Sequence, residues 1–149
     1  MLKTIIKPEL IILPGGRTNK KRIIIELVDL LAKAGIIRDR EALIEGLLYR
    51  EELMSTGIGL GIGIPHLRFD ELSKPVVAVA LQPEGIDDYE SLDSQPVRLV
   101  ILILVGKNQH REHIKLLSEI VSRLKKDDIL PRIFHSSDSR EICRLLSNG

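Results

Sequence analysis

Hydrophobic positions recur along the chain with two different spacings. Four segments have apolar residues three and four positions apart, which predicts amphipathic helices; they cover about 18–34, 39–54, 109–125 and 138–146. Two continuous apolar runs, at 76–81 and 97–105, predict buried strands, and 9–13 is a further short apolar piece that Pro14-Gly15-Gly16 closes with a turn. The run at 97–105 is the most hydrophobic and predicts a central strand that is buried on both faces. Because strands and helices interleave, the pattern predicts an α/β layered domain.

Capping residues define where these helices are expected to begin and end. Thr18 is the expected N-cap of the first helix, and Gly35 is expected to terminate it. Asp39 is the expected N-cap of the second helix. Asp138 and Glu141 have the spacing of a capping box at the start of the last helix.

The segment from Ser55 to His66 follows neither spacing. Its glycines alternate with large aliphatic residues, in the order Gly57, Ile58, Gly59, Leu60, Gly61, Ile62, Gly63, Ile64. As one extended strand it would have an aliphatic face and a bare face, and a bare face indicates that backbone or ligand comes close. Pro65 is expected to end this strand, so that His66 is presented at an open surface. The alternative is a flexible glycine turn in which His66 is an ordinary loop residue.

The other candidate chemistry lies on the predicted helices. His113 shares the apolar face of its helix near the N-terminus, where a neutral imidazole could sit beside an anion, although a hydrogen-bonded core histidine is the simpler interpretation. His110 precedes it by three positions, which is a weak metal-ligand spacing. His135 has no such neighbours and is expected at the surface. Arg50 is either a solvated helix end or a guanidinium fork that binds an oxyanion near His66.

Two further features have simple interpretations. The basic cluster that opens the first helix is expected to be solvated, with a phosphorylated or acidic partner as the alternative; it consists of Arg17, Lys20, Lys21 and Arg22. The single cysteine, Cys143, lies among apolar helix residues and is expected to be a small core residue.

Composition limits the classes of function. The chain has 149 residues, of which 44% are hydrophobic, so we expect one domain over residues 1–149. Lys and Arg number 22 against 21 Asp and Glu, and there are two Phe, two Tyr and no Trp, so no nucleic-acid partner is expected. The apolar runs are too short to insert in a membrane. With one cysteine and no signal-peptide profile, we expect a cytoplasmic protein.

Three pieces of sequence together resemble a family signature. They are Arg50-Glu51, Ser55-Thr56-Gly57-Ile58-Gly59 and Gly61-Ile62-Gly63-Ile64-Pro65-His66. This combination resembles the enzyme IIA domain, fructose/mannitol type, of the bacterial phosphoenolpyruvate-dependent phosphotransferase system, which includes stand-alone nitrogen-regulatory members. The resemblance covers almost the whole chain and implies a mixed, largely parallel sheet flanked by helices on both faces. Gly63 departs from the pattern, because the family usually has Ala there.

The resemblance implies a phosphohistidine carrier. His66 would accept a phosphoryl group from an HPr-like donor, with His113 and Arg50 assisting and with Ser55 and Thr56 contributing to phosphate binding. The group would pass to a IIB acceptor or serve regulation. Such a transfer depends on positioning and electrostatics, so no metal or organic cofactor is expected.

Two other classes of function remain open from the sequence. One is a non-catalytic regulatory module that keeps the scaffold and acts by binding alone. The other, weaker alternative is a metal-dependent hydrolase built on His66, His110 and His113.

Overall fold

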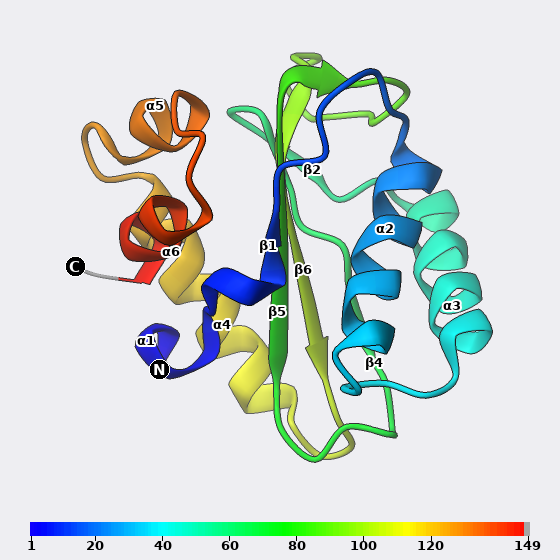
Figure 1. Cartoon of the computed structure of the whole chain (residues 1–149). Coiled ribbons are helices and arrows are strands. Elements are labelled where there is room, and N and C mark those ends of the chain that lie inside the picture. The colour runs from blue at the N-terminus through cyan, green and yellow to red at the C-terminus, as the bar shows by residue number, and fades with distance from the viewer. Residues whose placement is uncertain (148–149) are drawn as a thin grey trace.

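The computed structural model describes residues 1–147 and consists of one mixed sheet between two layers of helices (Figure 1). The strands are β1 (Ile11–Ile12), β2 (Gly57–Gly59), β3 (Ile62–Gly63), β4 (His66–Arg68), β5 (Val76–Ile86) and β6 (Val97–Val105). The helices are α1 (Leu2–Ile5), α2 (Lys20–Lys33), α3 (Arg40–Leu53), α4 (His110–Leu124), α5 (Ile129–Phe134) and α6 (Ser139–Ser147), with a short 3-10 helix, η1 (Pro8–Leu10). The prediction of an α/β fold is confirmed.

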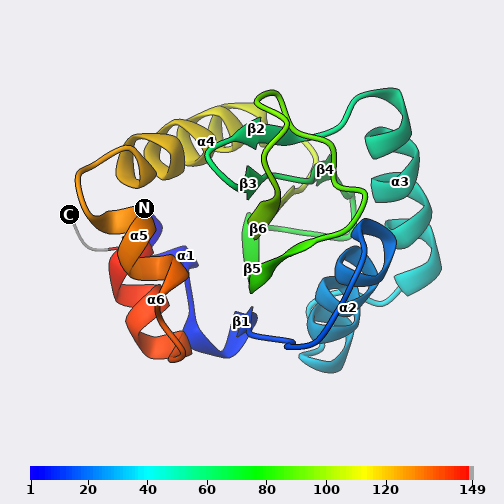
Figure 2. The same cartoon turned by 90° about the horizontal axis from the view of Figure 1, so that it is seen from above.

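The two helical layers cover opposite faces of the sheet, as the view from above shows (Figure 2). Strand β6 lies in the middle and all of its residues except Arg98 are buried. Alternate residues of β6 contribute to two cores, because successive side chains of a strand point to opposite faces. Leu99, Ile101 and Ile103 pack on the side of α4 and α6. Val100 and Leu102 pack on the side of α2 and α3. The expected central strand, buried on both faces, is therefore confirmed.

The sheet has the order β1-β5-β6-β3-β2, and β4 also pairs with β6. β1 with β5, β3 with β6 and β4 with β6 are parallel pairs. β5 with β6, the longest pair, and β2 with β3 are antiparallel. The mixed sheet that the resemblance implied is thus confirmed. Strand β5 extends to Ile86, beyond its predicted end at residue 81, and its later residues remain paired with the start of β6.

The helix ends agree with the predicted caps at three of four places. Asn19, rather than Thr18, caps α2, because its side-chain oxygen accepts from the Arg22 amide. Gly35 follows α2 with a positive φ of 74°, where glycine is favoured. The Asp39 and Asp138 side chains accept from backbone amides at the starts of α3 and α6. Across residues 1–147, every helix falls short of the length and hydropathy needed to cross a membrane.

The glycine segment is a hairpin, so the prediction of one continuous strand is wrong. Strands β2 and β3 are antiparallel, and the chain reverses at Leu60 and Gly61, whose φ angles are 60° and 81°. The aliphatic residues are divided as a result. Ile62 and Ile64 are buried in the core, whereas Leu60 is 57% exposed at the turn. Alternation alone did not reveal the reversal, because a tight turn between two short strands preserves the same spacing.

The bare side of this hairpin is covered by the protein itself. A Cβ on Gly57 would overlap the Glu90 carbonyl oxygen and lie 2.8 Å from the Cα of Ser91. A Cβ on Gly63 would lie 2.6 Å from the Tyr89 ring. The expected close approach is therefore real, and the group that approaches is the segment around residues 89–91. At position 63, where the family that this sequence resembles usually has Ala, the Tyr89 ring occupies the space that an alanine Cβ would need.

His66 follows the end of β3, as the sequence predicted, and it also begins a new strand. Only Ile64 and Pro65 separate β3 from β4, and both strands pair with β6 in the same parallel register, His66 lying opposite Ile103. The Pro65 carbonyl accepts from the Ile103 amide, so the loss of the proline N–H does not interrupt the ladder. This backbone pairing holds His66 at a defined position beside the central strand.

Substituting Gly57 tests the close packing of the hairpin. We expect Gly57→Ala to destabilise the protein by about 2–3 kcal/mol, since the overlap is with backbone that cannot rotate away. Urea unfolding would measure the change. The matched control is Leu92→Ala in the facing segment, where the side chain is 85% exposed and a change within about 0.5 kcal/mol is expected. Equal effects of the two substitutions would contradict the packing argument.

Candidate functional site

Three of the predicted residues meet where α3, α4 and β4 come together. Arg50 lies in the last turn of α3, His113 in the first turn of α4, and His66 at the start of β4. The Arg50 Nη2 donates to His66 Nε2 at 3.1 Å. The rings of His66 and His113 lie with their centroids 4.9 Å apart at an angle of 36°. The structure therefore brings these residues together from three separate elements.

The hydrogen bonds of His66 define which of its nitrogens can react. Nδ1 lies 2.9 Å from the Ile64 carbonyl oxygen. A carbonyl only accepts, so the proton of the neutral ring is assigned to Nδ1. Nε2 then carries the lone pair, which accepts from Arg50. The local turn through Pro65 thus orients the ring and leaves Nε2 as its nucleophilic atom.

His113 is partly buried beside this nucleophile. Its Nε2 is buried, and no hydrogen-bond partner for it occurs in the described part of the chain. Burial is the main cause that lowers the pKa of His113, and the positive charges that His66, His110 and Arg50 can carry lower it further. His113 is therefore held in its neutral form at neutral pH. A neutral ring with an unpaired buried nitrogen is suited to form one hydrogen bond with an oxygen atom bound beside it.

A small cavity of about 190 Å³ opens next to His66. Its lining combines four apolar residues, Met54, Ile58, Ile64 and Leu117, with four polar ones, Arg50, Ser55, Thr56 and His66. The predicted phosphate-binding residues Ser55 and Thr56 thus line the same cavity as His66. Their hydroxyl protons are used internally, since Ser55 donates to the Glu90 carbonyl and Thr56 to the Glu51 carboxylate. A role for them in phosphate binding stays a prediction.

A buried polar network supports this wall of the cavity. The Lys20 amine lies 2.7 Å from a Glu51 carboxylate oxygen, and the two side chains are 14% and 4% exposed. Glu51 accepts from both the amide and the hydroxyl of Thr56, at 3.1 and 2.7 Å. Because the Thr56 proton goes to Glu51, the Tyr89 hydroxyl donates to Thr56, at 2.7 Å. Lys20 also donates to Ser55 and lies 4.5 Å from the centre of the Tyr89 ring.

The interpretation of Lys20 as part of a solvated cluster is wrong. Arg17 and Arg22 are exposed as expected, but the Lys20 amine turns inward to Glu51. Burial and the nearby Glu51 charge raise the pKa of Tyr89, which therefore keeps its proton and remains a donor. The sequence pattern indicates no separate role for Glu51 or Tyr89. The only signal for Glu51 was its place beside Arg50 in the motif, and Tyr89 lay in an acidic segment without a pattern.

The remaining candidates lie outside this group or at its edge. His110 and His135 are exposed. Cys143 is partly buried against the core, in accordance with its expected role. Among residues 1–147, no three His, Cys, Asp or Glu side chains are arranged to hold a metal ion.

Comparison with known proteins decides the family. The family model described as "Phosphoenolpyruvate-dependent sugar phosphotransferase system, EIIA 2" matches residues 4–149. The chain belongs to this family. Among its EIIA relatives, a fructose-specific EIIA component of the phosphotransferase system from Haloferax volcanii is 36% identical over 98% of this chain and 94% of its own. The resemblance seen in the motifs is thereby confirmed.

Solved EIIA structures have the same fold. The nitrogen regulatory protein IIA-Ntr from Neisseria meningitidis superimposes with a TM-score of 0.88 and 28% identity, covering 97% of this chain and 98% of its own. The enzyme IIA-Mtl from Escherichia coli, solved in complex with phosphorylated enzyme IIB-Mtl, superimposes with a TM-score of 0.75 and 27% identity, covering 95% and 96%. Both a sugar-specific and a regulatory branch are thus similar to this EIIA chain.

Removing Lys20 tests the buried network. We expect Lys20→Met to destabilise the protein by about 3–5 kcal/mol, because the Glu51 charge would stay buried without its partner. In the double variant Lys20→Met/Glu51→Gln, the amide keeps hydrogen bonds to Thr56 and no charge is left unpaired. Unfolding in urea should show that the double variant recovers more than half of the loss. A double variant that is less stable than Lys20→Met would contradict this account.

The protonation of His113 makes a second test. Its folded-state pKa lies below the ordinary 6.5, so the unfolded chain binds this proton more readily than the folded one. The free energy of unfolding should therefore decrease as the pH falls through 6.5 towards the folded-state pKa. Histidine ring signals in an NMR titration would give the midpoint, and His113→Gln should reduce the pH dependence of stability. A midpoint at or above 6.5 would be incompatible with the burial seen here.

Proposed function

We propose that the protein is a phosphohistidine carrier of the phosphoenolpyruvate-dependent phosphotransferase system, formed as one domain over residues 1–149. It would accept a phosphoryl group on His66 and pass it to a IIB acceptor or use it for regulation. The proposal rests on the environment of His66. Its Nε2 lone pair accepts a hydrogen bond from Arg50, and its ring lies beside the ring of His113. Family membership supplies the reaction class.

The proposed step moves one phosphoryl group between two imidazoles. The Nε2 lone pair of His66 attacks the phosphorus of a phosphohistidine on an HPr-like donor, and an N–P bond forms as the donor's N–P bond breaks. The bonding electrons return to the donor imidazole, so no oxidant or further reactant is needed. Onward transfer is the same displacement with an acceptor on a IIB protein as the nucleophile. The reaction depends on alignment and on charge stabilisation rather than on further covalent chemistry.

Two neighbours would stabilise the charge on the transferred group. Arg50 hydrogen-bonds Nε2 in the free protein and must exchange that bond for phosphoryl oxygens once Nε2 is occupied. His113 can offer its unpartnered Nε2, protonated in one neutral tautomer, as a further donor. In this proposal Ser55 and Thr56 help to bind the same oxygens after their hydroxyls reorient.

The surroundings of the site favour protein partners. Large exposed hydrophobic side chains occur at the end of α3 and the start of α4, which carry Arg50 and His113, and on the β2–β3 hairpin that precedes β4. They are Tyr49, Leu53, Met54, Ile58, Leu60 and Ile114. Such an apolar rim is typical of a protein interaction surface. The related IIA-Mtl was solved with phosphorylated IIB-Mtl, so we propose a IIB protein and an HPr-like protein as partners that dock here in the cytoplasm.

A regulatory role is the second candidate, because the superposition on IIA-Ntr has the higher TM-score. Phosphorylation of His66 would add roughly −1.5 to −2 charges beside the apolar rim, which alters which partner can dock. A module that only binds partners, with His66 unmodified, is the competing proposal. The regulatory carrier requires a phosphohistidine at His66. The module that only binds partners acts with His66 unmodified.

Labelling by a phosphorylated donor tests the carrier function. Protein incubated with phosphoenolpyruvate, enzyme I and an HPr-like donor should gain one acid-labile phosphate, because Nε2 of His66 is the free nucleophile. His66→Ala should gain none. Intact-mass measurement at alkaline pH would quantify the modification. The control His110→Ala removes an exposed histidine from the same region and should be labelled normally.

Two neighbouring substitutions extend this test. Arg50→Ala should slow labelling by about 10²-fold, the usual effect of removing one charge-stabilising donor. His113→Ala should still be labelled on His66, but it should pass the group to an acceptor more slowly than wild type or lose it sooner by hydrolysis. Normal labelling of folded His66→Ala, or phosphate mapped to His113, would overturn the assignment of roles.

A further inference from the structure

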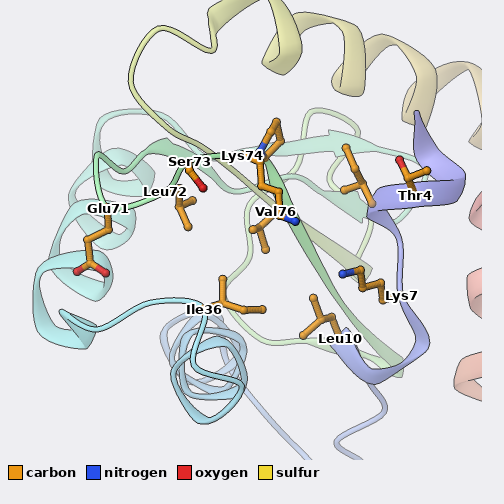
Figure 3. A pocket seen from close by; sticks show the side chains of 11 residues that line it. Thr4, Lys7, Leu10, Ile36, Glu71, Leu72, Ser73, Lys74 and Val76 are labelled. Carbon is orange, nitrogen blue, oxygen red and sulfur yellow. The ribbon is translucent and has the colours of Figure 1, made fainter.

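A second pocket lies outside the His66 site, at the junction of the N-terminal segment with the loop before β5 (Figure 3). Its volume is about 420 Å³. The floor is aliphatic and includes Leu10, Ile36, Leu72 and Val76, of which Leu10 and Leu72 are buried. A pocket of this size fits a small molecule.

Two lysines give this pocket its charge. Lys7 and Lys74 line it from separate segments, and Figure 3 shows both amines turned into the pocket, the Lys7 amine towards the Lys74 side. Neither amine forms an ion pair within the described residues. The one carboxylate in the lining, Glu71, accepts at 2.8 Å from the backbone amides of Arg38 and Asp39. Two positive charges without an ion-pair partner therefore face the aliphatic residues, and the carboxylate of Glu71 is directed to backbone amides instead.

We propose that this pocket binds a small organic dianion with an apolar body. The anionic group would lie between the Lys7 and Lys74 amines, and the apolar part would cover the aliphatic floor. Each lysine supplies a charge-assisted hydrogen bond. A phosphate monoester and a dicarboxylate share this chemistry, and the relative affinities of the two classes identify the preferred anionic group.

The pocket is joined by hydrogen bonds to the helix that carries His113. The Ser73 carbonyl in the pocket wall accepts from the Gln109 side chain at 2.7 Å. The same side chain accepts from the Gly106 amide at 2.6 Å, and Gln109 immediately precedes α4. A bound dianion that orders the 72–74 segment would therefore stabilise the start of α4, next to His66. This regulatory consequence rests on the proposed carrier function, whereas the binding itself does not.

Titration calorimetry with phenyl phosphate and with glutarate tests the binding, using the full chain alone. We expect at least one of them to bind with 1:1 stoichiometry, and the neutral analogue phenol to bind at least tenfold more weakly. Lys7→Gln and Lys74→Gln should each weaken binding by roughly tenfold, the effect of losing one charge-assisted bond. The control Lys3→Gln removes a nearby lysine that does not line this pocket and should bind as wild type does.

Chemical-shift changes should locate the binding at Leu72, Ser73 and Val76. Absence of binding by both dianions, undiminished binding by the folded double variant Lys7→Gln/Lys74→Gln, or shifts confined to the His66 site would each overturn the proposal. Under saturating dianion, the rate of His66 labelling should change by at least twofold. An unchanged rate with proven binding would overturn only the regulatory link, and failure of labelling without any dianion would instead count against the carrier function.

Discussion

The buried ion pair between Lys20 and Glu51 is the interaction on which the site depends most. It links the first turn of α2 to the last turn of α3, and through Thr56 and Tyr89 it holds the start of the glycine hairpin and the 89–91 segment. Burial of two charges is costly, so the arrangement is stable only while every partner is in place. Any loosening of the network would move the wall that Ser55 and Thr56 form beside His66.

The β2–β3 hairpin and β4 together position His66. Packing of Gly57 on the Glu90 carbonyl brings two backbones closer than any side chain would allow. On either side of Pro65 the chain pairs with β6, so the imidazole is held beside the central strand while its Nδ1 is bound to the Ile64 carbonyl. Arg50 and His113 come from helices on opposite sides of the sheet and meet only at this position. The nucleophile is thus rigid, and its two neighbours lie at helix ends.

Charge is distributed differently in the two pockets. At His66 the polar side chains are bound to one another, and the neutral His113 limits the positive charge beside the nucleophile. In the second pocket Lys7 and Lys74 form no ion pair within the described residues, and two positive charges outnumber the single carboxylate, Glu71, in the lining. The first arrangement suits a group that is received and passed on, and the second suits an anion that is retained. Gln109 connects the two regions through α4.

The sequence by itself determined the four helices of nine or more residues, the central strand and the identity of the three residues that meet at the site, but not the short helix α1. Periodicity and capping are local properties, so the helix ends at Gly35 and Asp39 could be read directly, and the motif that contains Arg50 and His66 indicated the family. Tertiary structure alone decided that the glycine segment is a hairpin, that Lys20 turns inward to Glu51, and that Lys7 and Lys74 share a pocket. The hairpin was hidden because its tight turn keeps the alternating spacing of one strand. The inward turn of Lys20 and the shared pocket depend on which distant segments pack together, and that packing leaves no periodic pattern in the chain.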